Sequence, residues 1–194
     1  MRSKKLFVRG LVCVLACVLT APSLLWATVK ARRDPLTEKE ADLVREAQAL
    51  DKRTEVFAKA AERRVLALTD PGAATSKQAL KDAEKWGDFP KGTRAELLGD
   101  IASILEEAVT NIEDVGSHNS KSRLIPKSIR ILAQASTRFL PQLAALRDKL
   151  KEEAERDALE KALEGIQEII VAAGKLEPEP QQTGKQKKEQ GTRR

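Results

Sequence analysis

Apolar side chains recur every three or four residues along four long stretches of the chain, and charged residues fill most positions between them. This period places the apolar residues on one face of an α-helix. The four stretches are residues 37–69, 93–116, 125–150 and 157–173. Because each apolar face has to be buried, we expect residues 34–174 to form an all-α domain, an antiparallel four-helix bundle with long helices.

The first two helices each begin at a threonine that is followed three residues later by a glutamate, which is the pattern of a capping box. The pairs are Thr37 with Glu40 and Thr93 with Glu96. In the first helix the apolar stripe keeps its phase past the polar residues 51–53. We therefore predict one unbroken helix over residues 37–69.

The third apolar stripe alternates steps of four and three residues, as in coiled coils, and Pro141 inside it predicts a kink. No glycine or proline separates the third stripe from the fourth. Between Leu150 and Ile166, however, a continuous helix would rotate its apolar face by about 160°. We predict a turn at residues 151–156, with Asp157 capping the fourth helix. The alternative is one continuous rod that needs a partner chain, and the coiled-coil spacing leaves a homodimer open.

The connection between the first two long helices, residues 70–92, contains turn-forming residues at both ends and a short helical stretch at 77–86. Trp86 and Phe89 lie in this connection and are half of the aromatic residues that follow residue 27. They pack the connection against the bundle in one interpretation. In the other they form a contact for a protein partner.

A basic opening is followed by the only long apolar run of the sequence, Leu11–Trp26, which contains both cysteines. This is the layout of an export signal. We interpret residues 1–31 as a signal peptide or an N-terminal anchor, with cleavage after Ala27 or after Ala31. The protein is then expected in the periplasm or outside the cell, and attached to the membrane only through this segment if it is not cleaved.

The formal net charge of +6 is located mainly in the two terminal segments, whereas residues 28–174 are nearly balanced. The chain has no tyrosine, and only 3% of its residues are aromatic. A nucleic-acid-binding surface normally combines clustered basic residues with rings for stacking, so we expect no nucleic acid as a partner. Residues 175–194 are polar and basic and predict a disordered tail.

Few residues suited to catalysis or metal binding remain once the signal is removed. The chain has one histidine, His118, which we place in a loop after the second long helix. No nucleophile motif and no phosphate-binding glycine loop is present. We therefore expect no catalytic residue, no metal and no cofactor. An alternative is an enzyme with carboxylate chemistry in a cleft under residues 70–92, using Glu84, Asp88 and Asp100.

The segment Pro35–Gln48 resembles the start of the periplasmic adaptor chaperones with a Leu-Thr-x-x-Gln motif, and Glu40 stands where that motif has glutamine. The body of the chain resembles exported bacterial helical-bundle proteins. We expect an exported, non-enzymatic helical protein that acts as an interaction, scaffold or adaptor module in the cell envelope, with an unknown protein as its partner. The chaperone resemblance implies the alternative of a periplasmic holdase-like chaperone or stress protein.

Overall fold

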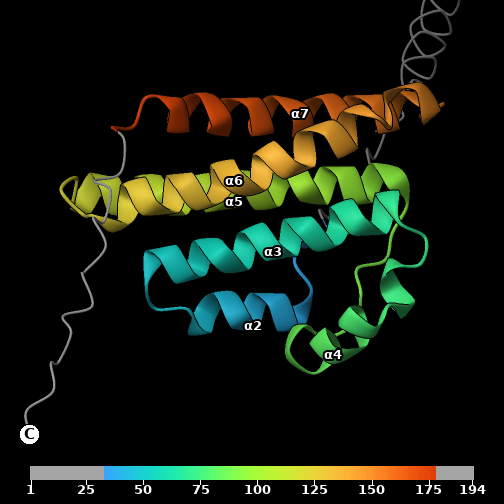
Figure 1. Cartoon of the computed structure of the whole chain (residues 1–194), viewed down its shortest axis with the longest axis horizontal. Helices are drawn as coiled ribbons and strands as arrows, with labels where there is room; N and C mark the ends of the chain where they lie inside the picture. The colour runs from blue at the N-terminus through green and yellow to red at the C-terminus, as the bar shows by residue number, and fades with distance from the viewer. Residues whose placement is uncertain (1–32, 178–194) are drawn as a thin grey trace, which may run out of the picture. The chain divides into compact units, whose positions relative to one another are not determined.

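The computed structural model describes residues 33–177, and within this range it contains helices and no strand (Figure 1). The α-helices are α2 (Glu38–Glu46), α3 (Leu50–Thr69), α4 (Lys77–Trp86), α5 (Arg94–His118), α6 (Leu124–Ala144) and α7 (Glu153–Gly174). Two short 3₁₀ helices, η1 (Ala73–Thr75) and η2 (Arg147–Lys149), follow α3 and α6. The prediction of an all-α protein is confirmed.

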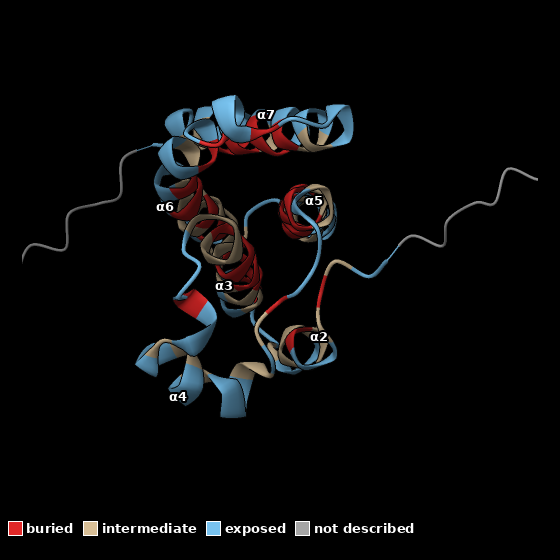
Figure 2. Ribbon diagram, turned by 90° about the vertical axis from the view of Figure 1, so that its right-hand side faces the viewer, coloured by how far each residue is buried: buried red, intermediate tan, exposed pale blue. Residues whose placement is uncertain are grey.

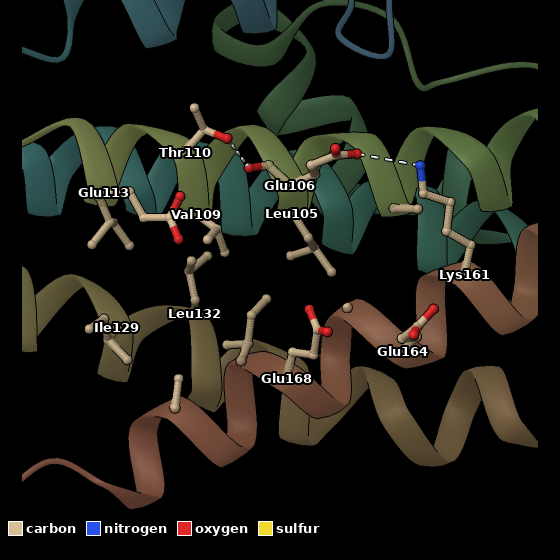
Figure 3. A pocket seen from close by; sticks show the side chains of 15 residues that line it. Leu105, Glu106, Val109, Thr110, Glu113, Ile129, Leu132, Lys161, Glu164 and Glu168 are labelled. Carbon is tan, nitrogen blue, oxygen red and sulfur yellow. Dashed lines mark hydrogen bonds and ion pairs between the residues drawn. The ribbon is translucent and has the colours of Figure 1, made fainter.

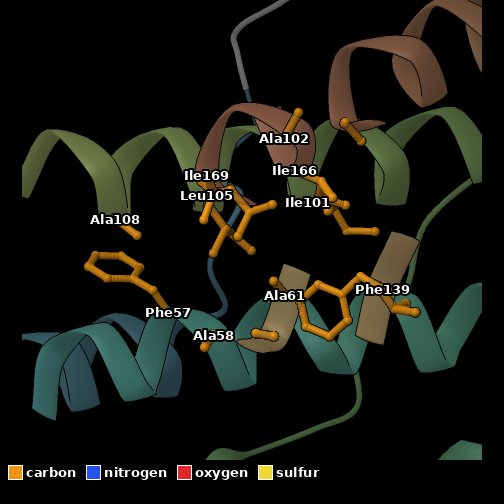
Figure 4. Packing of buried hydrophobic residues seen from close by; sticks show 14 of the residues in the cluster. Phe57, Ala58, Ala61, Ile101, Ala102, Leu105, Ala108, Phe139, Ile166 and Ile169 are labelled. Carbon is orange, nitrogen blue, oxygen red and sulfur yellow. The ribbon is translucent and has the colours of Figure 1, made fainter. Parts of the chain in front are cut away.

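The four longest helices bury one continuous apolar cluster. Helix α3 packs against α5 and α6, and α7 packs against the same two helices from the other side (Figure 2). Each of the four contributes buried leucine, isoleucine, valine, alanine or phenylalanine side chains to this cluster, and Figure 4 shows part of it. Figure 2 views α5 along its axis but α7 from the side, so α7 crosses α5 obliquely.

The prediction of one unbroken helix over residues 37–69 is wrong. The helix ends at Glu46, and α3 begins at Leu50 and runs back along α2 in the opposite direction (Figure 1). Arg53 stabilises the turn, since its Nε donates a 3.2 Å hydrogen bond to the carbonyl oxygen of Ala47. The turn contains neither glycine nor proline, and for that reason the sequence pattern passed over it.

The connection from α3 to α5 contains the short helix predicted at residues 77–86. This helix, α4, contacts α2 and η1, and none of its residues is buried. Its Leu80 is 66% exposed. Helix α4 therefore lies on the surface, outside the cluster formed by the four long helices.

The prediction that the third and fourth stripes form separate helices is confirmed, but the turn predicted at residues 151–156 is placed too late, because the break between α6 and α7 covers residues 145–152. Helix α6 continues through Pro141 and ends three residues later, while Leu146 and Leu150 remain buried beyond its end. The predicted start at Asp157 is wrong, because α7 begins at Glu153. Its first turn contains acidic residues, which the positive end of the helix dipole stabilises without a side-chain cap.

Helix α5 also differs from the prediction at its end. It passes Gly116 and ends at His118, because Gly116 keeps a helical conformation and Asn119 N–H bonds to the carbonyl of Val115. The predicted signal segment, residues 1–31, and the tail beyond residue 177 lie outside the described residues. Within residues 33–177, none of the helices combines the length and the apolar character that a membrane span requires.

Candidate functional site

A cluster of buried charges joins α2 to α3. The Glu40 side chain has no exposed surface, and Arg63 and Arg64 are almost fully buried beside it. Arg63 Nη1 donates a 2.5 Å hydrogen bond to the Glu40 carboxylate, and Arg64 Nη1 lies 2.7 Å from the same carboxylate. Glu40 also completes the predicted capping box, because its Oε2 accepts a 2.9 Å bond from Thr37 N–H.

Arg63 extends this cluster to the end of α4. Its two terminal nitrogens donate to the carbonyl oxygens of Trp86, Gly87 and Asp88 at 3.0, 3.0 and 2.7 Å. Gly87 has φ +68°, and a side chain there would meet Lys39 at 2.9 Å, so this close approach requires glycine. Arg63 thus fixes the start of the loop that leads into α5.

Trp86 and Phe89, the predicted partner contacts, both lie beside this arginine and are half-buried. The Arg63 guanidinium lies 5.6 Å from the centre of the Phe89 ring, and Lys85 lies 5.9 Å from the centre of a Trp86 ring. Each ring thus has a cation–π contact within the chain. Their role in partner binding stays a prediction.

Arg64 connects the cluster to the segment before α2 and to α5. It donates to the carbonyl oxygens of Pro35 and Ala60 at 2.6 and 2.9 Å, and its Nε lies 3.9 Å from Asp100 Oδ2. Two arginines and two carboxylates balance their charges here. Because the guanidinium and carboxylate groups bind one another and the backbone, we interpret the cluster as structural.

The three carboxylates of the enzyme alternative are not brought into one cavity. A cavity of about 120 Å³ lies between α3, η1 and α4, and its acidic lining residues are Asp70 and Asp82. Glu84 and Asp88 are exposed elsewhere, and Asp100 is buried beside Arg64. The three carboxylates named in the enzyme alternative therefore do not line this cavity together.

His118 is the last residue of α5 and not a loop residue, and it is exposed. Its Nδ1 lies 2.8 Å from the carbonyl oxygen of Asp114 and 3.0 Å from Ser117 Oγ. Among residues 33–177, no group of three or more histidine, cysteine or acidic side chains is placed to hold a metal ion.

A larger open groove lies where α5, α6 and α7 meet. Its volume is about 730 Å³, and Figure 3 shows α5 along one wall and α7 along the other. The side chains that form its floor are apolar and come from all three helices: Leu105, Val109, Ile112, Ile129, Leu132 and Ile169. Several of these are also part of the main apolar cluster, so the groove reaches down to the core.

Acidic side chains form the rim of this groove. Glu106 and Glu113 extend from the α5 wall, and Glu164 and Glu168 extend from the α7 wall (Figure 3). Among the described lining residues the only basic one is Lys161, whose Nζ lies 3.4 Å from Glu106 Oε2. The groove therefore combines an apolar floor with a negative rim.

Small residues on α7 keep the groove open. Gly165 and Ala172 lie on the groove side of α7, one and three turns after Lys161. A side chain added at Gly165 would meet no atom within 4 Å, so this glycine borders empty space. Figure 3 shows α7 running away from α5 beyond the Lys161 contact, which widens the groove toward the end of α7.

The sequence pattern does not predict this groove. The available signal was a second set of apolar residues on α5, Ala102 and Val109, which lie beside the main stripe and widen its apolar face. A wider apolar face indicates an extra contact surface, but it does not distinguish a third neighbouring helix from an open groove.

Two carboxyl groups on the long helices have pKa values that are shifted in opposite directions. Lys127 Nζ on α6 donates a 2.6 Å hydrogen bond to Asp51 Oδ2 on α3, and this bond lowers the pKa of Asp51 despite its burial. On α5, partial desolvation raises the pKa of Glu107, although the residue as a whole is exposed, and repulsion from Asp34 adds to the increase.

These shifts predict opposite effects of pH on two variants. The folded protein favours ionised Asp51, so the stability lost in Asp51→Asn should be constant near neutral pH and disappear as the pH falls from about 4 through the lower folded pKa. Glu107 provides the opposite case. Its raised pKa disfavours the ionised form, so Glu107→Gln should be more stable than the natural protein at pH 7, and the two should converge as the pH falls toward about 4.3. Urea unfolding from pH 2.5 to 8 measures both, and parallel pH profiles for all three proteins would contradict this account.

No protein-family model, no curated protein and no solved structure matches the chain. The geometry and charge of the groove are therefore the available indications of its function.

Proposed function

We propose that this chain is an exported, non-enzymatic helical protein that acts by contact with another protein, as an interaction, scaffold or adaptor module in the cell envelope. The observation that carries the proposal is the open groove between α5 and α7, with its apolar floor and acidic rim. Partner-binding grooves commonly place apolar contact area at the centre and charged residues at the edge.

The helix packing supports a groove that keeps its shape. The proposal takes α3, α5, α6 and α7 as an antiparallel four-helix bundle, in which α3 packs against α5 and α6 on the side away from α7. The floor residues Leu105, Leu132 and Ile169 are buried, so their positions are fixed by the core beneath them. A partner can then bind without ordering the groove first, which lowers the entropic cost of binding.

The composition of the groove favours contact over catalysis. Its described lining residues include no serine, cysteine or histidine, and its carboxylates are on exposed helix faces. Acidic side chains on the exposed faces of amphipathic helices are normally solvated surface residues, which favours a role in contact.

Chemical cross-linking in the cells that produce the protein tests the proposal. The experiment compares the natural chain with Gly165→Leu, which fills the groove, and with Gly165→Ala, which adds one methyl group to the same position. A defined partner, identified by mass spectrometry, should cross-link to the natural chain and to Gly165→Ala at similar yield. Absence of any reproducible cross-linked protein from all three would contradict the proposal.

Export gives a separate prediction. The mature chain should begin at Thr28 or Arg32, because we propose cleavage after Ala27 or Ala31, or it should retain residues 1–31 as an anchor. Cell fractionation followed by intact-mass measurement distinguishes these forms. The protein is expected in the envelope or the medium in each case, and recovery of the full-length chain in the cytoplasmic fraction alone would contradict export.

A holdase-like chaperone is the second candidate, because the same apolar floor fits segments exposed by an unfolding client. Such a protein should delay the aggregation of a heated client at near-equal molar ratio, and Gly165→Leu should reduce the delay. Unchanged aggregation in the presence of the natural protein would exclude this candidate.

A further inference from the structure

We infer that the groove binds one amphipathic helix of a partner protein, with lysine or arginine on both sides of the helix's apolar face. This inference rests on the proposed function and specifies the class of partner. Three observations carry it: the kind of backbone that the walls accept, the charge of the rim, and the composition of the other segments that could enter the groove.

The walls favour a helical occupant. The α5 wall is the middle part of its helix, and the α7 wall runs from the middle of its helix to the last turn, so most backbone N–H and C=O groups along both walls are bonded within their own helix. An extended peptide over the apolar floor would leave its backbone groups without partners, whereas a helix satisfies its own. The lining residues of α5 run from Ala102 to Glu113, which is about 17 Å or three helical turns.

The rim favours basic residues at both edges of the occupant. The α5 wall presents Glu106 and Glu113, and the α7 wall presents Glu164 and Glu168, while Lys161 is close to Glu106. A helix that inserts apolar residues between these walls places its flanking positions next to the two pairs of carboxylates. Charge complementarity of this kind selects the partner and increases the rate of association.

Other segments of this chain match only one half of the site. Residues 178–194 contain basic residues but no leucine, isoleucine, valine, methionine or aromatic side chain for the floor. The run Leu11–Trp26 is apolar along its whole length, and the basic residues near it lie beyond its two ends, not on both sides of an apolar helix face. A second copy could offer α4, which has Lys77, Lys81 and Lys85, yet its only large exposed aliphatic side chain is Leu80. A separate protein with both features therefore fits best.

The test uses the protein as it is purified from the cells that produce it, together with three fluorescent peptides of about 14 residues, the length of roughly four turns. The first peptide has leucine on one helical face and lysine on both flanks. The second replaces the lysines with glutamate. The third has the composition of the first, with the leucines distributed around the helix. Fluorescence anisotropy measures binding to the natural chain and its variants.

The first peptide should bind with saturation, the second should bind at least about tenfold more weakly, and the third should not saturate. Gly165→Leu should weaken binding of the first peptide by at least about tenfold, whereas Gly165→Ala should leave it within about twofold, because only the larger side chain fills the groove. The double variant Glu113→Gln with Glu168→Gln should weaken the first peptide and reduce its salt dependence. Circular dichroism confirms that each variant is folded.

Equal binding of the first two peptides, or binding that Gly165→Leu leaves unchanged, would overturn the inference. So would light scattering that shows a dimer dissociated by the peptide, because a second copy would then occupy the groove. Binding that is seen only after removal of residues 178–194 would identify the tail as the occupant and overturn it too. If none of the peptides binds but a partner protein is cross-linked reproducibly, this inference alone is rejected. Peptide binding without any cross-linked partner would reject the proposed function.

Discussion

Replacing Glu40 with glutamine is expected to lower the free energy of unfolding by about 3–5 kcal/mol, because it leaves two buried guanidinium groups without their shared counter-charge. Arg63 and Arg64 both contact this carboxylate, and all three side chains are almost completely shielded from water. Glutamine keeps the size of the side chain and an oxygen for Thr37 N–H, so the effect isolates the charge. Chemical denaturation at pH 7 measures it.

The matched control for this variant is Glu55→Gln. Glu55 lies on α3 and pairs with Lys52 at 2.9 Å, but both side chains are largely exposed, and removing the pair should change the free energy of unfolding by less than about 0.5 kcal/mol. Glu40→Gln should also speed proteolysis of residues 86–92, because Arg63 holds the carbonyls of Trp86, Gly87 and Asp88. Equal stability losses in the two variants would show that the buried cluster is no more important than a surface ion pair.

The same glutamate shows how far local patterns predict this fold. A threonine followed three residues later by a glutamate identified the start of α2, because a capping box involves neighbours in sequence. Its second role depends on arginines 23 and 24 residues further along the chain. In a continuous helix those groups would be about 35 Å apart. The contact exists only because α3 turns back along α2, and no local pattern encodes that turn.

Residues 47–49 explain why the turn was missed. They are Ala-Gln-Ala, which a helix accepts readily, and the apolar stripe keeps its phase across them. The helix ends because Arg53 bonds to the Ala47 carbonyl and because the buried pairing of Glu40 with the arginines stabilises the hairpin. Tertiary contacts thus override a favourable local helix propensity.

The groove was hidden from sequence for a different reason. The apolar stripes of α5 and α7 correctly identified helix faces that pack together, since the period depends only on positions within one helix. The oblique crossing of α7 over α5 depends on how both helices fit α6, and it determines whether Gly165 faces a neighbour or empty space. A glycine inside a helix indicates a special packing position, but it does not show whether that position faces a close neighbour or empty space.

The second large effect is expected in the core. Replacing Phe139 with alanine should lower the free energy of unfolding by about 3–5 kcal/mol, because it removes a large buried side chain and leaves a cavity between packed helices. Phe139 is 1% exposed and lies on α6, which packs against α3 and α7 (Figure 4). Ala58 and Ala61 on α3 belong to the same apolar cluster, and their short side chains cannot extend to refill the space. Thermal and urea unfolding measure the loss, which is a large share of the 5–15 kcal/mol typical of a domain.

Gln142→Ala on the same helix provides the control, because Gln142 is exposed and its loss should change the free energy of unfolding by no more than about 0.5 kcal/mol.

A change at Phe139 also tests whether groove binding depends on the stability of the whole domain. Phe139 lies well beyond the floor residues Ile129 and Leu132 on α6 and does not line the groove. Folded Phe139→Ala should therefore bind the basic amphipathic peptide as the natural chain does, whereas Gly165→Leu should lose binding and keep its stability. Unchanged stability of Phe139→Ala would show that α6 is not packed into the core as described. Loss of peptide binding by the folded variant would show that the groove depends on the whole core.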